Sequence, residues 1–164
     1  MKKLICILAL GMLLCGCGAP VYETIGNVIH VGQQDAAPRS IAILLPEDAT
    51  VLTSSGTDTM YLCNDYTMSL QTLPGGDLAA TVRNLSGYEP SQVTLLKSRC
   101  GDHDRYDWVW VAAGENGDVL CRAAVLDDGN YHYALTVVAD AGADLTDTWN
   151  ELFSSFCLDS QEEA

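Results

Sequence analysis

The stretch that decides the fold runs from residue 106 to residue 139 and reads YDWVWVAAGENGDVLCRAAVLDDGNYHYALTVVA. Two polar breaks, Asn116-Gly117 and Asp128-Gly129, are dipeptides that favour tight type I′ hairpin turns. They separate three segments rich in β-branched and aromatic residues, at 106–113, 118–126 and 131–139. The sequence therefore predicts an antiparallel meander of three strands.

If each break is a two-residue loop, the pairing register is fixed and alternate side chains share a face. One face then carries Trp108, Trp110, Ala112, Val119, Cys121, Ala123, Val125, His132, Ala134 and Val138. The other carries Val109, Val111, Leu120, Arg122, Ala124, Leu126, Tyr131, Tyr133, Leu135 and Val137. Neither face is polar, whereas a sheet with one solvated face alternates apolar and polar residues. We therefore expect cover on both faces, with helices as the cover.

Two segments have the features of such helices. Residues 78–86 follow Asp77, which is a good N-cap, and stop at Gly87, which is a good C-cap. Residues 144–156 place acidic groups at the N-terminus and large apolar residues on one stripe: Leu145, Trp149, Leu152, Phe153 and Phe156. Further strands are expected at 41–45, 57–63, 66–73 and 93–97. The expected fold class is α+β: an antiparallel β-sheet meander covered by helices on both faces, as an α/β/α sandwich.

The N-terminus has the features of a bacterial secretion signal. Lys2 and Lys3 precede an apolar run at 4–14, which is too short to span a bilayer. Residues 14–17, Leu-Cys-Gly-Cys, resemble the lipobox, which implies cleavage before Cys17 and a lipid on its sulfur. The alternative is an ordinary cleaved signal without lipid. We expect a protein on the extracytoplasmic face of the bacterial cell membrane, whose partner there is the lipid bilayer, bound through acylated Cys17.

This interpretation divides the chain into four parts. We expect a signal peptide at 1–16, a lipidated tether and linker at 17–37, a single α+β domain at 38–159 and a polar tail at 160–164.

The C-terminal half resembles the end of the PsbP-like fold, in which a long strand, a short acidic loop and a helix lead to a Ser-Phe pair. The matching segments are 131–137 and 149–156, and the pair is Ser155-Phe156. The resemblance implies an antiparallel sheet between helices and a role in binding or assembly. No position here matches the metal site of the photosynthetic members, so no site is carried over.

The net charge of −14 narrows the choice of partners. Removal of Lys2 and Lys3 with the signal takes it to −16 on side chains. Such a chain repels phosphates and anionic headgroups, so we expect no nucleic-acid partner and no membrane contact by the folded domain.

Four cysteines remain after the signal and Cys17 are set aside: Cys63, Cys100, Cys121 and Cys157. An oxidising compartment permits disulfides among them, in any of three pairings, and the alternative is four buried thiols.

An acidic loop at residues 102–107 is the candidate metal site. Oxygen ligands from Asp102, Asp104 and Asp107 could hold Ca²⁺, although the EF-hand pattern is absent. The alternative is a solvated turn before a strand.

A second candidate site lies on the meander itself. His132 shares the predicted face with Trp108 and Trp110, as in a binding or acid–base site, or as a packed core histidine. Arg122 lies mid-strand on the other face, either as an anion-binding group or within a buried ion pair.

Motifs of nucleophilic, phosphate-binding and zinc-protease enzymes are missing from the sequence. The expected function is a non-enzymatic binding or accessory domain on a membrane-anchored lipoprotein, with an unknown extracytoplasmic protein or small ligand as partner. The alternative is an accessory lipoprotein that captures a divalent cation or solute through the 102–107 loop.

Overall fold

The computed structural model describes residues 37–143 and 146–159. The signal peptide, Cys17, the tether before residue 37 and the tail at 160–164 lie outside the described residues, so the predictions made for them stay predictions.

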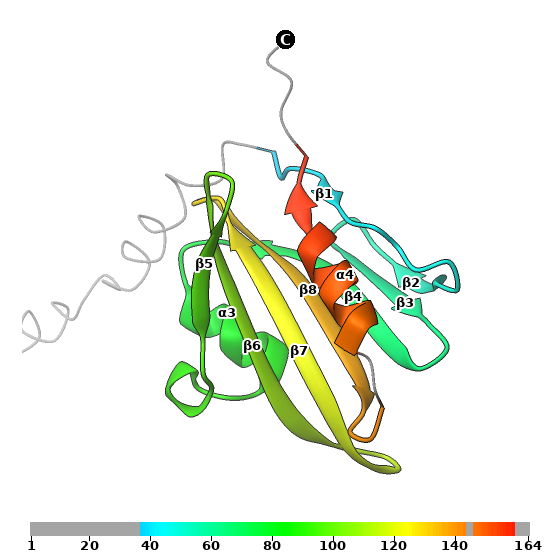
Figure 1. The fold of residues 1–164 in the computed structure, drawn as a ribbon. Helices are drawn as coiled ribbons and strands as arrows, with labels where there is room; N and C mark the ends of the chain where they lie inside the picture. The colour runs from blue at the N-terminus through cyan, green and yellow to red at the C-terminus, as the bar shows by residue number, and fades with distance from the viewer. Residues whose placement is uncertain (1–36, 144–145, 160–164) are drawn as a thin grey trace, which may run out of the picture. The chain divides into compact units, whose positions relative to one another are not determined.

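The predicted meander forms the centre of the molecule as three long antiparallel strands (Figure 1). They are β6 (His103–Gly114), β7 (Gly117–Asp127) and β8 (Tyr131–Asp140). The first turn holds Glu115 and Asn116 between the paired Gly114 and Gly117, and Gly117 adopts a φ of 137° that favours glycine. The second turn is longer, because the last pair of β7 with β8 joins Asp127 to His132.

The pairing registers of β6 with β7 and of β7 with β8 each differ from the predicted register by two residues. A shift by an even number leaves every side chain on its face, since the side-chain period of a strand is two. The two predicted faces are therefore confirmed: Trp108, Trp110 and Cys121 share one core cluster, and Tyr133, Leu135 and Val137 share the other.

Four further strands complete a seven-stranded sheet in the order β2-β3-β4-β8-β7-β6-β5. They are β2 (Thr50–Ser54), β3 (Asp58–Leu62), β4 (Tyr66–Pro74) and β5 (Leu96–Cys100), and every pairing is antiparallel. The strands expected at 57–63 and 66–73 are confirmed as β3 and β4. The strand expected at 93–97 starts later, as β5, after the 3-10 turn η1 (Pro90–Gln92) and a connection at residues 93–95.

The chain ends meet in a second, two-stranded sheet. The strand expected at 41–45 is limited to β1 (Ile41–Ala42), which pairs with β9 (Cys157–Leu158). Strand β2 was not predicted from the sequence.

Helix α3 (Leu78–Ser86) has the predicted boundaries. The Asp77 carboxylate accepts a hydrogen bond from Ala80 N at 2.9 Å, and Gly87 closes the helix with a φ of 76°. Helix α4 (Thr146–Ser155) covers most of the second predicted helix, whose residues 144 and 145 lie outside the described part.

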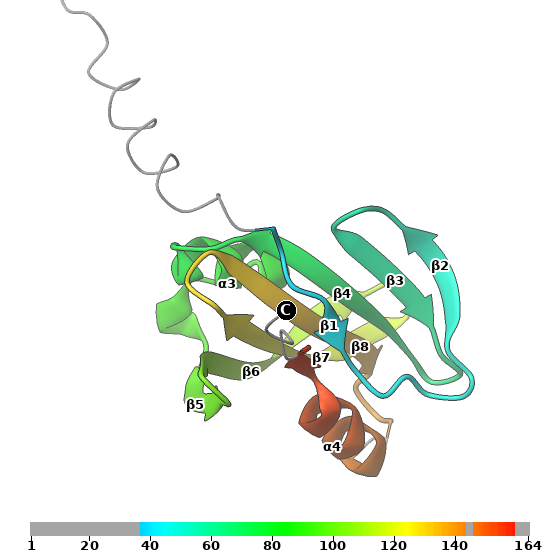
Figure 2. The same cartoon turned by 90° about the horizontal axis from the view of Figure 1, so that it is seen from above.

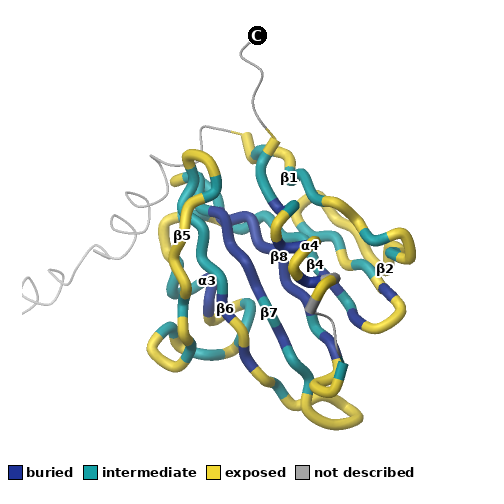
Figure 3. The backbone as a smooth tube through the Cα atoms, in the orientation of Figure 1, coloured by how far each residue is buried: buried dark blue, intermediate teal, exposed yellow. Residues whose placement is uncertain are grey.

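The prediction of an α/β/α sandwich is wrong, because the described chain is dominated by the antiparallel sheet. The two short helices lie on opposite sides of it, α3 over the Trp108 face and α4 over the Tyr133 face (Figure 2). Each covers only the central strands. The terminal strand β2 is exposed along its whole length (Figure 3). Two-sided apolar patterning is a property of β6, β7 and β8, and it does not extend to the edges of the sheet.

Candidate docking edge of the sheet

The residues predicted from the sequence to bind a ligand do not form one site. Trp108 and Trp110 stack with their ring centroids 6.1 Å apart, on the α3 face. Trp108 is buried, as is Val82 of α3 in the same cluster, so its indole is core. Trp110 also borders an open cavity of about 400 Å³ with Val109 and Val111.

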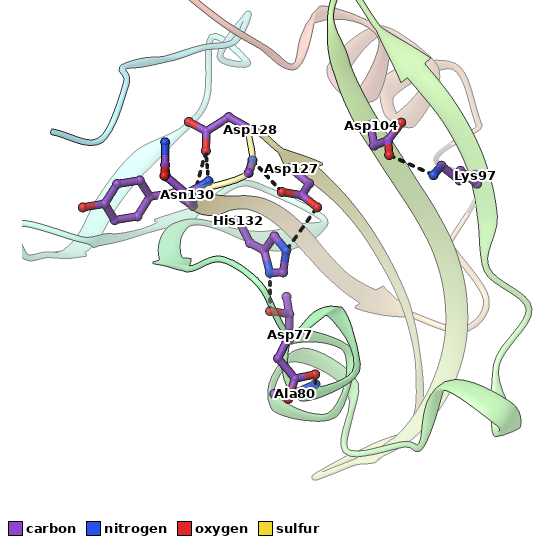
Figure 4. Close-up of polar contacts among 11 residues, drawn as sticks. Asp77, Ala80, Lys97, Asp104, Asp127, Asp128, Asn130 and His132 are labelled. Carbon is purple, nitrogen blue, oxygen red and sulfur yellow. Dashed lines mark hydrogen bonds and ion pairs between the residues drawn. The ribbon is translucent and has the colours of Figure 1, made fainter. Parts of the chain in front are cut away.

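His132 is 1% exposed and connects the sheet to α3. Its Nδ1 lies 2.7 Å from the Thr81 hydroxyl, and its Nε2 lies 3.6 Å from the Asp127 carboxylate (Figure 4). The order hydroxyl, imidazole, carboxylate is that of a nucleophile, a base and an orienting group. However, Thr81 is itself only 3% exposed, so a substrate has no access to its hydroxyl. The arrangement supports a helix-anchoring role for His132.

Arg122 lies on the opposite face, beneath α4. Its guanidinium lies 4.0 Å from the Phe153 ring centroid and 3.6 Å from Asp107. The same carboxylate holds Arg105 through two bonds, of 2.7 and 3.0 Å, and Arg105 also donates to Phe153 O at 2.8 Å. Burial lowers the pKa of Arg122, and the hydrogen bond to Asp107 raises the pKa of Arg105. Arg122 is thus part of a half-buried ion cluster under α4, separated by the sheet from Trp108 and His132.

The predicted metal site is not assembled. Asp104 and Asp107 both lie in β6, three positions apart, so their side chains point to opposite faces. Asp104 pairs with Lys97 at 2.8 Å, and Asp107 is held by the two arginines. In the described ranges, no three His, Cys, Asp or Glu side chains are placed to hold a metal. Residues 102–107 were predicted to form a loop, whereas β6 begins at His103 and its pleat separates the carboxylates.

The four candidate disulfide cysteines are all free in the described structure. Cys63 and Cys121 are buried in different core clusters, and burial raises the pKa of both thiols. Cys100 and Cys157 are partly exposed and border one cavity of about 380 Å³.

The candidate functional surface is instead formed by residues 44–62, which we call the docking edge. Nine large apolar side chains are exposed in the described residues, and six of them lie here: Leu44, Leu45, Val51, Leu52, Met60 and Leu62. The segment comprises the loop after β1 and the β2–β3 hairpin at one end of the sheet (Figure 3). Exposed apolar groups gathered on one segment are typical of interaction surfaces.

Strand β2 leaves backbone groups unpaired at this edge. Ser55 N donates to Asp58 O at 2.7 Å, which fixes which residues bond inward to β3. Because inward and outward residues alternate in an antiparallel pair, Ser54 presents its N–H and C=O away from β3. Beyond the bulge between Val51 and Thr53, Val51 does the same. Among the described strands, only β3 pairs with β2.

The opposite edge strand of the sheet, β5, differs from β2 in its charge. Strand β5 carries the cations Lys97 and Arg99, which discourage pairing with another chain. Strand β2 reads Thr-Val-Leu-Thr-Ser and carries no charge. Of the two edge strands, β2 is the one without charged side chains.

Comparisons with known proteins give a shared fold and no family. No protein-family model matches the sequence, and no curated protein matches it. A crystal structure from Bacteroides thetaiotaomicron aligns with a TM-score of 0.53 at 12% identity, over 75% of this chain and 46% of that chain. This chain therefore spans less than half the length of that protein.

Two further crystal structures align with lower scores. PA94 from Pseudomonas aeruginosa, described as of unknown function, has a TM-score of 0.42 at 16% identity, over 71% of this chain and 81% of its own. LpqN, involved in cell envelope biogenesis of Mycobacterium tuberculosis, has a TM-score of 0.44 at 17% sequence identity. That alignment covers 77% of this chain and 88% of LpqN. Of the helices in the described ranges, none is long and apolar enough to cross a membrane.

Proposed function

We propose that this protein is an extracytoplasmic lipoprotein, anchored in the bacterial cell membrane by acylated Cys17, whose domain binds another protein and catalyses no reaction. The observation that carries the binding role is the docking edge, where uncharged β2 combines an unpaired edge with exposed apolar side chains. Removing apolar surface from water is favourable by about 25 cal/mol per Å². A partner that covers these side chains is therefore bound more tightly.

The anchoring role rests on the N-terminal sequence. A charged start, a short apolar run and a small residue before Cys17 are the features that a lipoprotein signal requires. Two acyl chains give stable membrane attachment where one chain gives only reversible binding. The strongly acidic domain then stands off an anionic membrane surface, which leaves the docking edge available to a protein.

The absence of catalysis is supported by the burial of the hydroxyl–imidazole–carboxylate arrangement. Thr81 of α3 and His132 of β8 are both buried between the helix and the sheet, and Arg122 is engaged by Asp107 and Phe153. A hydrolytic role would require an exposed nucleophile within reach of its base.

Anchoring is tested by the mass of the mature protein purified from membranes. The wild-type protein is expected to start at Cys17 and carry acyl chains, and Cys17→Ser is expected to remain unprocessed or to leave the membrane fraction. An unmodified thiol in the mature wild-type protein would contradict the lipid anchor.

Binding is tested with a photo-crosslinking amino acid at Leu52, placed in the full-length protein in its native membrane. We expect a discrete adduct from Leu52 and none from the control position Val109, which is exposed to a similar degree on β6, next to the opposite edge strand. Adducts of equal yield at both positions would indicate non-specific apolar contact and would overturn the docking role of β2.

A further inference from the structure

We infer that the docking edge takes an extended segment of a partner protein, which adds to β2 as an eighth strand and carries apolar side chains on both faces together with Lys or Arg. This inference rests on the proposed function and specifies how the partner is recognised. The backbone pairing, the side-chain faces and the charges around β2 support it.

The outward-facing backbone of β2 is the first argument. Ser54 and Val51 offer N–H and C=O groups to a further strand, and main-chain pairing at a free edge is an established mode of peptide recognition. The bulge at Leu52 interrupts this row. We therefore expect a short pairing, whose strength depends as much on side chains as on the backbone.

The placement of the apolar side chains is the second argument. Met60 and Leu62 pair with Ser69 and Thr67, which puts them on the α3 face of the sheet. Val51 pairs with Tyr61, which belongs to the α4 face. Exposed apolar groups thus flank the edge on both faces. An added strand projects alternate side chains to both faces and covers both groups, whereas a partner lying on one face would leave the other group in water.

Charge is the third argument and determines the chemistry of the partner. Between Arg39 and Arg83 the chain contains no Lys or Arg, but it contains five acidic residues: Glu47, Asp48, Asp58, Asp65 and Asp77. An uncharged strand within a uniformly acidic segment attracts a cationic partner and repels an acidic one. A second copy of this chain is disfavoured, because each copy has a net charge of −14.

The test uses synthetic peptides and the full-length protein in detergent. The probe is a capped peptide of about eight residues, Ile-Ile-Lys-Lys-Ile-Ile-Lys-Lys, whose paired repeat places isoleucine and lysine on both faces of a strand. Two matched peptides accompany it: one in which glutamate replaces lysine, and one in which alternate backbone nitrogens are methylated so that strand pairing is blocked. Binding is followed by fluorescence anisotropy at low and at physiological salt.

We expect the lysine peptide to bind and to weaken as salt rises, and both matched peptides to lose affinity by about tenfold or more. Val51→Lys adds to β2 the kind of charge that β5 carries and is expected to abolish binding. Val109→Lys, at a site of similar exposure, is expected to leave binding unchanged. Equal binding of the methylated or the acidic peptide would overturn the inference.

Self-association measured by analytical ultracentrifugation, and removed by Val51→Lys, would overturn it in favour of a second copy. A peptide result and a crosslinking result also separate the two proposals. If Leu52 crosslinks a partner while no peptide binds, docking at the edge stands and strand addition is wrong. If Leu52 and Val109 crosslink alike, the docking role itself is wrong.

Discussion

The Nδ1 atom of His132 lies 2.7 Å from the hydroxyl oxygen of Thr81, and this contact joins β8 to helix α3 inside the core. Thr81→Val keeps the shape of the side chain and leaves a buried imidazole nitrogen without its partner. We expect the free energy of unfolding to fall by about 1–3 kcal/mol, the usual cost of an unsatisfied buried polar group. Chemical denaturation measures it.

The matched control is Thr136→Val on β8, the strand that carries His132. The Thr136 hydroxyl is buried and has no hydrogen-bond partner within the described ranges, so its removal should be neutral or stabilising. Equal destabilisation by the two substitutions would mean that the Thr81–His132 contact contributes nothing.

A second prediction concerns the ion cluster beneath α4. Asp107→Asn removes the one carboxylate that Arg105 and Arg122 share and leaves two guanidinium groups facing each other. We expect a loss of about 1.5–3 kcal/mol, the range for hydrogen bonds to charged groups. Asp102→Asn, at an exposed position, serves as the control in the same denaturation experiment, and a similar loss there would contradict a special role for Asp107.

The third prediction concerns alkaline pH. Tyr133 donates to Asp128 at 2.8 Å and accepts from Arg39 N at 2.8 Å. Burial and then the bond to Asp128 raise the pKa of Tyr133 to about 12, although the Arg39 N–H opposes them. The pKa of an unfolded tyrosine is about 10. The raised pKa therefore stabilises the fold fully below pH 10, and this stabilisation is lost as pH rises through 12.

Tyr133→Phe should accordingly be less stable than wild type at neutral pH, with a difference that shrinks above pH 10. The denaturation midpoints of both proteins, measured across this range, decide the matter. Tyr131→Phe removes a hydroxyl from the same strand, leaves the Tyr133–Asp128 bond in place and should show no such pH dependence. A constant gap between Tyr133→Phe and wild type would refute the prediction.

The fourth prediction concerns Gly75, at the end of β4. A Cβ atom there would lie 2.7 Å from the backbone carbonyl atoms of Asn130, and backbone cannot move aside cheaply. Gly75 N also donates to Asn130 O at 2.8 Å. We expect Gly75→Ala to lower the melting temperature clearly, as overpacking costs about 1–3 kcal/mol. Gly56→Ala, where no atom lies within 4 Å, should change it little.

A fifth prediction follows from the separation of Asp104 and Asp107 on opposite faces of β6. A bound ligand at a hundred times its dissociation constant adds about 2.7 kcal/mol to stability. Because no cation site is assembled in the described part of the chain, we expect millimolar calcium to leave the melting temperature unchanged. A calcium-dependent rise, lost in Asp104→Asn, would restore the metal-capturing alternative.

The central strands and helix α3 could be predicted because local signals and burial agree there. Asp77 and Gly87 mark the ends of α3 through capping alone, and the faces of β6, β7 and β8 survive a register error because it was even. The predicted register was wrong because an Asn-Gly or Asp-Gly pair indicates a turn without fixing which residues close it. Glu115 and Asn116 form the first loop, rather than Asn116 and Gly117.

The edges of the sheet could not be predicted in the same way. Strand β2 packs little, so its residues show no apolar alternation, and only its Thr and Val content favoured a strand. Its lack of charge was the readable signal, but its meaning depends on β2 being a terminal strand, which only the topology shows. Likewise, the separation of Arg122 from His132 follows from their faces, whereas their partners Asp107, Phe153 and Thr81 come from distant parts of the chain.

The pairing of β1 with β9 brings Ile41 opposite Leu158, and Asp159 N donates to Ser40 O at 3.0 Å. A fluorophore or affinity tag fused after the last strand therefore reports from the place where the N-terminal chain enters the domain. A probe inserted at Glu115–Asn116, in the hairpin at the far end of the long strands, reports from the opposite pole (Figure 1). Used as a pair, the two positions would give both ends of a distance measurement along the long strands.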